Sequence, residues 1–486
     1  MKRVLFSSVV WFLSLLNGVA HVGSPNVIFE GAAGPYPVRV IVRPPGVVPG
    51  LAEITVRALT NGVSEVRVLP VHARAGTEGA PPPDVAKPVP GETNLFTAEL
   101  WLMVGGAYSV NVEVEGGAGR GAIMVPVNSI ATRRLTLSPA LGTLLAALGV
   151  LLFALLISIV GAAIRESVLP PGESPSRRRM WFARGAVALA AVFLGTALAG
   201  GKRWWDAEDA NYRNNRLFKP ARIDASVEGT GADRALILGI RDENRGNLGW
   251  TPLVPDHGKL MHAFLVREPG LDAFAHLHPR RRSEKVFETG WPPLPAGSYR
   301  IYADVTHENG LSKTLIGSID LPEAPASRRL DADDSWRTSP PLTPSAPGPP
   351  GGTVVTALTE DLAMRWERPD RLETGREVSL RFVVLDAEGK AVRLEPYMGM
   401  VSHAIIRRED GAVFTHLHPA GSLSIAAQQV FEIRRQGRDG QRITAELMEK
   451  MCRLPPPSER EGSFSFPYEF PQPGRYRIWV QVKISS

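Results

Sequence analysis

The stretch SHAIIRREDGAVFTHLHP, residues 402–419, has two apolar runs on either side of Asp410-Gly411. Asp-Gly is a strong signal for a two-residue turn between antiparallel strands. Pairing outward from this turn places His403 opposite His418, and His416 lies on the same face because side chains alternate along a strand. The sequence therefore predicts a β-hairpin that gathers three imidazoles at one end, with Pro419 ending its second strand.

A second copy of this pattern lies earlier in the chain. MHAFLVR (261–267) is followed by FAHLHP (274–279), and the same counting puts His262 opposite His278 with His276 on that face. Both copies continue into a turn and strand of one kind, GSYRIY (297–302) and GRYRIW (474–479). A match in residue type, order and spacing indicates a duplicated module.

Strand-length apolar or alternating segments, separated by turns, favour a mainly β fold. The 486 residues exceed what one core holds, and 47 Gly and 42 Pro are typical of many short strands. We expect three β-sandwich modules of immunoglobulin-like or cupredoxin-like type, at 21–129, 215–322 and 353–486, with a Pro-rich spacer at 324–352. The third module has an insertion, Gln428 to Cys452, whose composition favours a helix.

Two apolar segments, 138–164 and 185–201, are expected to cross a membrane. The run from Leu141 to Ile164 has no charged residue, and at ~1.5 Å per residue it spans the ~30 Å hydrocarbon core. The second run is shorter, and a buried soluble hairpin is its alternative. The loop between them, 165–184, carries five arginines against two glutamates, so the positive-inside rule places it in the cytoplasm.

The N-terminus has the pattern of a signal peptide, residues 1–20. Lys2 and Arg3 precede an apolar core, and Gly18 and Ala20 mark a cleavage site. An uncleaved anchor helix is the alternative. Together with the loop charge, this pattern predicts an inner (cytoplasmic) membrane protein whose N- and C-terminal domains lie on the periplasmic, extracytoplasmic side.

Neutral imidazoles grouped in this way suit copper first and zinc second. The candidate ligands are the six hairpin histidines: His262, His276, His278, His403, His416 and His418. Thioethers would also suit Cu(I), but strict alternation points Met261 and Met400 away from their neighbouring histidines, and Met398 would need a bend. The alternative is that the histidines only pack within the sandwiches and recur because the fold was duplicated.

Other polar residues carry weaker signals. His257 and His307 are candidates to complete the site of the second module, and His21 would begin the mature chain. His72 is expected to be an ordinary strand or loop residue. The acidic residues after the second span are expected to be a solvated linker, namely Asp206, Glu208 and Asp209.

Several classes of function are not expected. The chain has no G-x-S-x-G, Walker or H-E-x-x-H motif, so we do not expect an enzyme. A blue-copper site needs a Cys with two His, and no histidine follows Cys452. The net charge is +6, but acidic and basic residues are interleaved, which argues against nucleic-acid binding.

The His-x-His-Pro hairpins and the closing PGRYRIWVQV (473–482) resemble exported bacterial modules associated with heavy-metal handling. The first module resembles the YtkA-like and copper-resistance β-sandwich group in its strand pattern. This resemblance implies copper binding or delivery, with the lipid bilayer and a periplasmic or membrane metal-handling protein as partners. The alternative is a metal-free envelope scaffold built from immunoglobulin-like modules.

Overall fold

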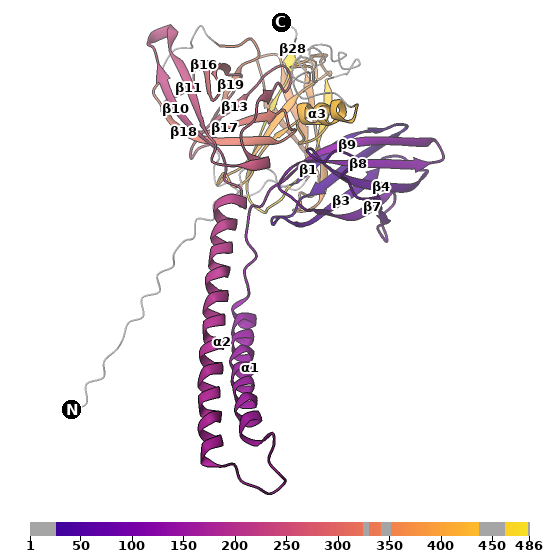
Figure 1. Cartoon of the computed structure of the whole chain (residues 1–486). Coiled ribbons are helices and arrows are strands. Elements are labelled where there is room, and N and C mark those ends of the chain that lie inside the picture. Colours follow the sequence, from indigo (N-terminus) through magenta and orange to yellow (C-terminus); the bar gives the residue numbers. More distant parts are fainter. Residues whose placement is uncertain (1–25, 324–329, 342–350, 437–461, 485–486) are drawn as a thin grey trace, which may run out of the picture. The chain divides into compact units, whose positions relative to one another are not determined.

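The computed structural model describes residues 26–323, 330–341, 351–436 and 462–484 (Figure 1). The described chain is mainly β, with several sheets and two long apolar helices. It divides into two compact units, one formed by residues 1–130 with 219–486 and the other by residues 131–218. The predicted signal peptide and His21 lie outside the described residues.

The first module, residues 26–130, consists of two packed antiparallel sheets. One has the order β1 (Val27–Ala33), β2 (Tyr36–Arg43), β3 (Gly50–Ala58), β7 (Leu95–Leu102) and β6 (Lys87–Pro88). The other has the order β5 (Asp84–Val85), β4 (Val63–His72), β8 (Gly106–Gly116) and β9 (Gly119–Ser129). Val40 and Ile54 of one sheet share a fully buried core with Val66 and Val110 of the other. The alternating pattern of each strand buries one apolar face of each sheet.

The second module, residues 219–341, has one continuous sheet where the sequence predicted a two-sheet sandwich. Its order is β15 (Arg280–Ser283), β16 (Val286–Gly290), β11 (Ala235–Arg241), β10 (Arg222–Glu228), β18 (Ser312–Leu321), β17 (Gly297–His307), β13 (His262–Arg267), β14 (Ala273–Leu277) and β19 (Ser335–Thr338). β12 (Leu253–Val254) also pairs with β17, and the short 3₁₀ turns η2 (Gly231–Asp233) and η3 (Gly246–Leu248) lie in loops. β10 pairs in parallel with β18 and joins the two halves, while Leu238 and Leu265 share one core, so the sheet curls over itself.

β19 lies within the segment that was predicted to be a spacer, 324–352. It pairs antiparallel with β14, with Trp336 opposite Ala275. The spacer prediction was therefore wrong for residues 330–341; the rest of that segment, 324–329 and 342–350, lies outside the described residues. An edge strand such as β14 offers unpaired backbone groups, and a short segment without sequence periodicity can satisfy them.

The third module, residues 351–484, again has separate sheets. They have the orders β20 (Thr353–Ala357), β21 (Ala363–Glu367), β22 (Glu377–Leu385), β26 (Ser463–Glu469), and β25 (Phe414–Leu417), β24 (His403–Arg408), β27 (Tyr476–Gln481). β23 (Leu394–Glu395) pairs with β28 (Lys483–Ile484). Leu380 of the first sheet and Ile406 of the second are buried in one core.

A helix, α3 (Ile425–Arg435), confirms part of the predicted helical insertion. It begins three residues before the predicted start, because the side chain of Ser424 caps it by accepting a hydrogen bond from the Ala427 backbone N–H at 3.1 Å. Val430 and Ile433 lie on its buried face. Residues 437–461, with Cys452, lie outside the described residues.

The first and third modules pack against each other. Ile28 and Ile41 of the first module belong to the core of the third, and Asn26 Nδ2 donates to Glu469 Oε1 at 2.6 Å. Arg39 and Glu377 form an ion pair at 3.2 Å across the same contact. The third module thus completes its core with residues of the first.

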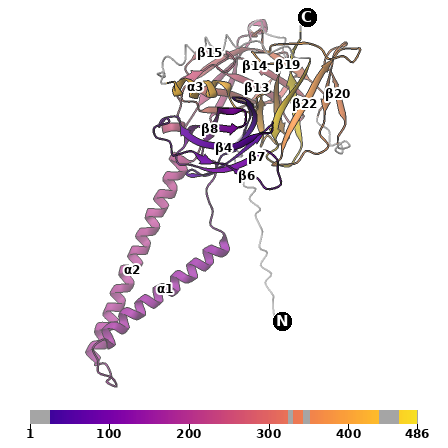
Figure 2. The same cartoon turned by 90° about the vertical axis from the view of Figure 1, so that its right-hand side faces the viewer.

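The other unit is a helical hairpin, seen from a second side in Figure 2. α1 (Pro139–Glu166) and α2 (Arg177–Asn211), which is followed by the π-helical turn η1 (Tyr212–Arg216), each contain a segment long and apolar enough to cross a membrane. α1 begins one residue after the start of its predicted span and ends two residues beyond it, whereas α2 extends past its predicted span at both ends; the connection is therefore shorter than the predicted loop 165–184. Arg and Trp residues are compatible with helix, so α2 continues past its apolar segment at both ends.

Candidate metal centre

The predicted register of both histidine hairpins is confirmed. Ala404 pairs with Leu417 and Ala263 with Leu277, so one residue further His403 lies opposite His418 and His262 opposite His278. Each hairpin has a third strand in the same place, since Phe264 pairs with Tyr302 and Ile405 with Trp479. The two modules therefore share a three-stranded ribbon, as the repeat predicted.

The two ribbons face each other. Along β13, Ala263 and Leu265 enter the core of the second module, whereas Phe264 and Val266 face outward. Along β24, Ala404 faces its own core and Ile405 faces outward. The outward side chains form one buried interface cluster: Phe264, Val266, Leu271, Phe274, Tyr302, Ile405, Phe414 and Trp479. The two repeats thus pack through their equivalent faces.

Seven of the ten histidines in the chain meet at one end of this interface. They are the six predicted ligands and one more: His257, His262, His276, His278, His403, His416 and His418. Two groups of three each have nitrogen atoms within 4.8 Å of one another. We call His262, His276 and His278 the intramodule triad, because all three come from the second module. We call His257, His403 and His418 the cross-module triad.

In the intramodule triad, one nitrogen of each ring is held by a neighbour. Nε2 of His262 lies 3.0 Å from the Asp256 carbonyl oxygen, and Nδ1 of His276 lies 2.9 Å from Gln481 Oε1. Nδ1 of His278 lies 3.0 Å from Asp334 Oδ1. Since these three oxygens accept hydrogen bonds, each ring places its proton there and keeps a lone pair on its other nitrogen.

Those lone pairs point at one another. His262 Nδ1 and His276 Nε2 are 3.1 Å apart, and neutral rings with these tautomers leave no proton between them. His278 Nε2 is buried and makes no hydrogen bond among the described residues. Two nitrogens on one tetrahedral ion with bonds of ~2.0–2.1 Å lie about 3.3 Å apart. The arrangement fits a cation, with the supporting acceptors that metal-binding histidines ordinarily have.

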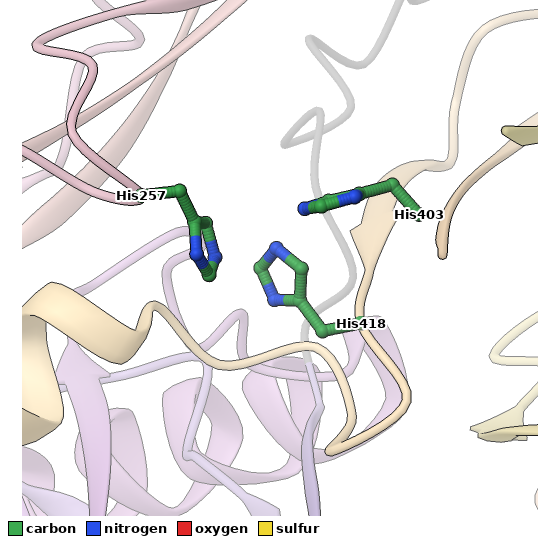
Figure 3. Close-up of side chains that lie close together, drawn as sticks. All are labelled: His257, His403 and His418. Carbon is green, nitrogen blue, oxygen red and sulfur yellow. The ribbon is translucent and has the colours of Figure 1, made fainter. Parts of the chain in front are cut away.

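The cross-module triad has a different environment (Figure 3). The three rings point toward one another, with centroids 4.7 Å (His257–His418), 5.1 Å (His403–His418) and 5.3 Å (His257–His403) apart. All six of their ring nitrogens are buried, and within the described part of the chain none makes a hydrogen bond of normal geometry, although the backbone of Met398 approaches His257 and that of Leu423 approaches His418. Asp256 Oδ1 lies 3.5 Å from His257 Nε2.

His416 lies between the two triads. Its ring centroid is 5.5 Å from that of His262 and 4.5 Å from that of His418. Its Nδ1 faces Asp304 Oδ2 at 3.5 Å, and its buried Nε2 has no hydrogen-bond partner among the described residues. The predicted ligand set is therefore brought together in full, as one continuous cluster of imidazoles.

Burial keeps six of these seven rings neutral. It lowers the pKa of His257 to about 3 and the pKa of His416 to about 4. It also holds the pKa values of His262, His276, His403 and His418 well below the usual 6.5, with neighbouring histidines adding to the effect. A neutral imidazole is the form that binds a metal ion, so no proton competes for these nitrogens near neutral pH.

Some features of the site could not be predicted from the sequence. His257 was a candidate for the site of the second module, but it lies in the cross-module triad instead. Asp334 and Gln481 were not predicted as partners of the histidines. Asp334 lies in the segment expected to be a spacer, and Gln481 belongs to the other repeat, so no local pattern pointed to either.

The other residues considered in the sequence lie outside the two triads and make contacts of an ordinary structural kind. His72 ends β4 and packs edge-on to Tyr108 at 4.8 Å, and His307 Nδ1 bonds the Thr251 carbonyl at 2.8 Å. Met261 is fully buried in the core of the second module, which agrees with the alternation argument against it as a ligand. Asp206 and Asp209 lie in α2 rather than in the predicted linker, and they form ion pairs with Lys202 and Arg213.

Comparisons with known proteins give little further information. Residues 357–486, most of the third module, match a family described only as a domain of unknown function (DUF8832). No curated protein matches the chain. Among solved structures, a crystal structure of a tetra-tandem repeat in the extending region of a large adhesion protein is similar at 7% identity and a TM-score of 0.16, over 82% of this chain and 91% of that one.

Proposed function

We propose that this chain is a membrane-anchored, extracytoplasmic metal-binding protein that binds or delivers copper through its facing histidine hairpins. The observation that carries the proposal is the intramodule triad. Three buried imidazole lone pairs converge there, and each ring is oriented by its own acceptor on the far nitrogen.

The alternative, that the histidines merely pack, meets an energetic difficulty. A buried polar group without a partner costs about 1–3 kcal/mol. The cross-module triad alone has six such nitrogens among the described residues, and since each neutral ring is protonated on one nitrogen, three of the six are lone pairs that a cation could take. Packing or a hydrogen-bond network would pair these atoms with protein groups, whereas a bound cation uses unpaired lone pairs directly.

Copper is the ion we favour. Neutral imidazoles suit copper, zinc, nickel and iron, and in the divalent series copper binds such donors most tightly. The resemblance of the hairpins to exported modules of heavy-metal handling supports the same choice. Zinc is the competing ion, because three histidines are also a common zinc ligand set.

Two features support the membrane anchor and its orientation. α1 and α2 are apolar enough to span a bilayer. The five arginines expected to mark the cytoplasmic side lie at the connected ends of the helices, in the last turn of α1 and the first turns of α2. This orientation places the β modules on the opposite, extracytoplasmic side.

The test is the metal content of the full-length protein, purified in detergent and stripped with a chelator. The full chain is needed because the first module completes the core of the third. Protein is exposed separately to Cu(I), Cu(II) and Zn(II), desalted, and analysed for bound metal. The variant is His278→Asn, and the matched control is His307→Asn, which changes a buried histidine outside the cluster.

We expect copper retention at one or more equivalents, reduced in His278→Asn and unchanged in His307→Asn. Retention of zinc in preference to copper would keep metal binding and overturn the choice of ion. No retained metal, or equal retention by both variants, would overturn the metal site and leave the envelope scaffold as the better explanation.

A further inference from the structure

The cross-module triad depends on one residue from the second module, His257, which occupies a strained turn. The backbone of Asp256 and Lys259 closes this turn by two hydrogen bonds of 2.9 Å. His257 has a φ of +52°, a left-handed conformation that side chains other than glycine rarely adopt. A conformation of this kind persists when the surroundings hold it in place, and it is often found at binding sites.

The surroundings that hold the turn belong to the third module. Asp256 Oδ2 accepts a hydrogen bond from the Ser424 hydroxyl at 2.7 Å, and Asp256 Oδ1 accepts one from the Ala426 backbone N–H at 3.2 Å. Both donors lie at the start of α3. The residue next to His257 is thus fixed to the third module, and this contact directs the imidazole toward His403 and His418.

The third module has the same turn without the histidine. Tyr397 and Met400 close it by backbone hydrogen bonds of 2.7 and 3.1 Å, and Met398, with a φ of +49°, occupies the place of His257. The fold was therefore duplicated, but the crossing histidine comes from one repeat alone. The duplication therefore does not explain why a histidine stands at position 257.

We propose that the cross-module triad is a second copper site, distinct from the intramodule site, and that its ion clamps the second module to the third. This rests on the proposed function in that both sites take the same class of ion. The carrying observation is independent: two candidate ligands from one module and one from the other converge within 4.8 Å, and none of their six buried nitrogens makes a hydrogen bond of normal geometry among the described residues.

The clamp has a thermodynamic consequence. An ion that needs ligands from both modules binds only when they are docked, so its binding free energy adds to the stability of the docked state. An ion in the intramodule triad needs only the second module for its ligands and adds to docking only indirectly. Loss of His257 is therefore expected to remove one ion and part of the copper-dependent stabilisation.

The experiment uses the full-length protein in detergent, loaded with copper, with bound copper and the midpoint of thermal unfolding as readouts. The main variant is His257→Asn, because asparagine tolerates a left-handed φ and keeps the turn. His418→Asn tests the same site from the third module. His278→Asn tests the intramodule site, and His307→Asn is the control.

We expect two equivalents of copper in the unmodified protein and in His307→Asn, and one in His257→Asn, His418→Asn and His278→Asn. We also expect copper to raise the unfolding midpoint less in His257→Asn than in the unmodified protein. Should His257→Asn fail to fold, the result for His418→Asn decides.

Two results would overturn the clamp. One is two equivalents of copper in His257→Asn or His418→Asn. The other is a single equivalent in the unmodified protein that is lost in His278→Asn and kept in His257→Asn, which would leave the proposed function standing. Absence of copper from the unmodified protein would overturn both proposals together.

Discussion

At the residue scale, the state of each imidazole follows from burial and from the atom that faces its second nitrogen. Burial lowers the pKa of His257 to about 3 and that of His416 to about 4, so both rings are neutral near neutral pH. A carbonyl, an amide oxygen and a carboxylate then select which nitrogen of His262, His276 and His278 keeps its lone pair. Such partners orient the ring and raise its basicity toward a metal.

The partner that can be tested most directly is Asp334. Its Oδ1 accepts hydrogen bonds from both the backbone N–H of His278 at 2.8 Å and the ring Nδ1 at 3.0 Å. Asp334→Asn keeps an acceptor oxygen but removes the charge. We expect copper affinity at the intramodule triad to fall about 10–100-fold, measured by competition with a chelator of known affinity.

Asp333→Asn is the control for this change. It removes the charge of the neighbouring carboxylate, which forms an ion pair with Lys259 at 3.2 Å rather than a hydrogen bond with His278. It should leave the affinity unchanged. Equal affinity in Asp334→Asn and the unmodified protein would show that the carboxylate does not support the ligand.

At the element scale, the site is a product of strand alternation. Each hairpin directs small and aliphatic residues into its own module and presents histidines and aromatic rings on the opposite face. Tyr302 and Phe414 stack across the interface with centroids 4.0 Å apart. The buried Arg407 adds a hydrogen bond from its Nε to the Tyr302 hydroxyl at 2.8 Å and an ion pair with Glu268.

Removing one of these rings is expected to loosen the site. Phe414→Ala deletes a fully buried aromatic side chain, which ordinarily costs about 3–5 kcal/mol of stability. We expect a lower thermal unfolding midpoint by circular dichroism and less copper in the cross-module triad. Trp101→Ala removes an aromatic side chain from a residue that is 57% exposed and should change stability by about 0.5 kcal/mol or less. An unfolding midpoint for Phe414→Ala as high as that of Trp101→Ala would contradict the interface argument.

At the scale of the whole molecule, the proposed orientation of the helical hairpin decides on which side of a membrane the candidate metal centre would lie. Cys452 is the only cysteine in the chain, so Cys452→Ser gives a background for labelling. In this cysteine-free background, two substitutions are made one at a time. Glu173→Cys lies in the connection between α1 and α2, and Glu284→Cys is exposed between β15 and β16.

We expect a membrane-impermeant maleimide to label Glu284→Cys in intact cells and to label Glu173→Cys only after the cells are opened. The positive-inside rule is the physical reason, since arginines flank the connection on both sides. Labelling in the reverse pattern would place the β modules in the cytoplasm and remove the extracytoplasmic part of the proposed function.

The sequence alone determined the local parts of this protein. Asp410-Gly411 and the alternation around it predicted the register of one hairpin, and the repeat predicted the other, because turn geometry and side-chain period act over a few residues. The two apolar helices were likewise evident from length and composition. Six of the seven clustered histidines were therefore identifiable as candidate ligands without a structure.

Only the tertiary structure decided how these parts meet. It placed the hairpins face to face, brought His257 into the triad of the other repeat, and added β19 with Asp334 behind His278. None of these contacts has a sequence signature, because each joins segments far apart in the chain. They form where buried faces and unpaired strand edges find complementary surfaces, which is a property of the packed molecule rather than of any local stretch.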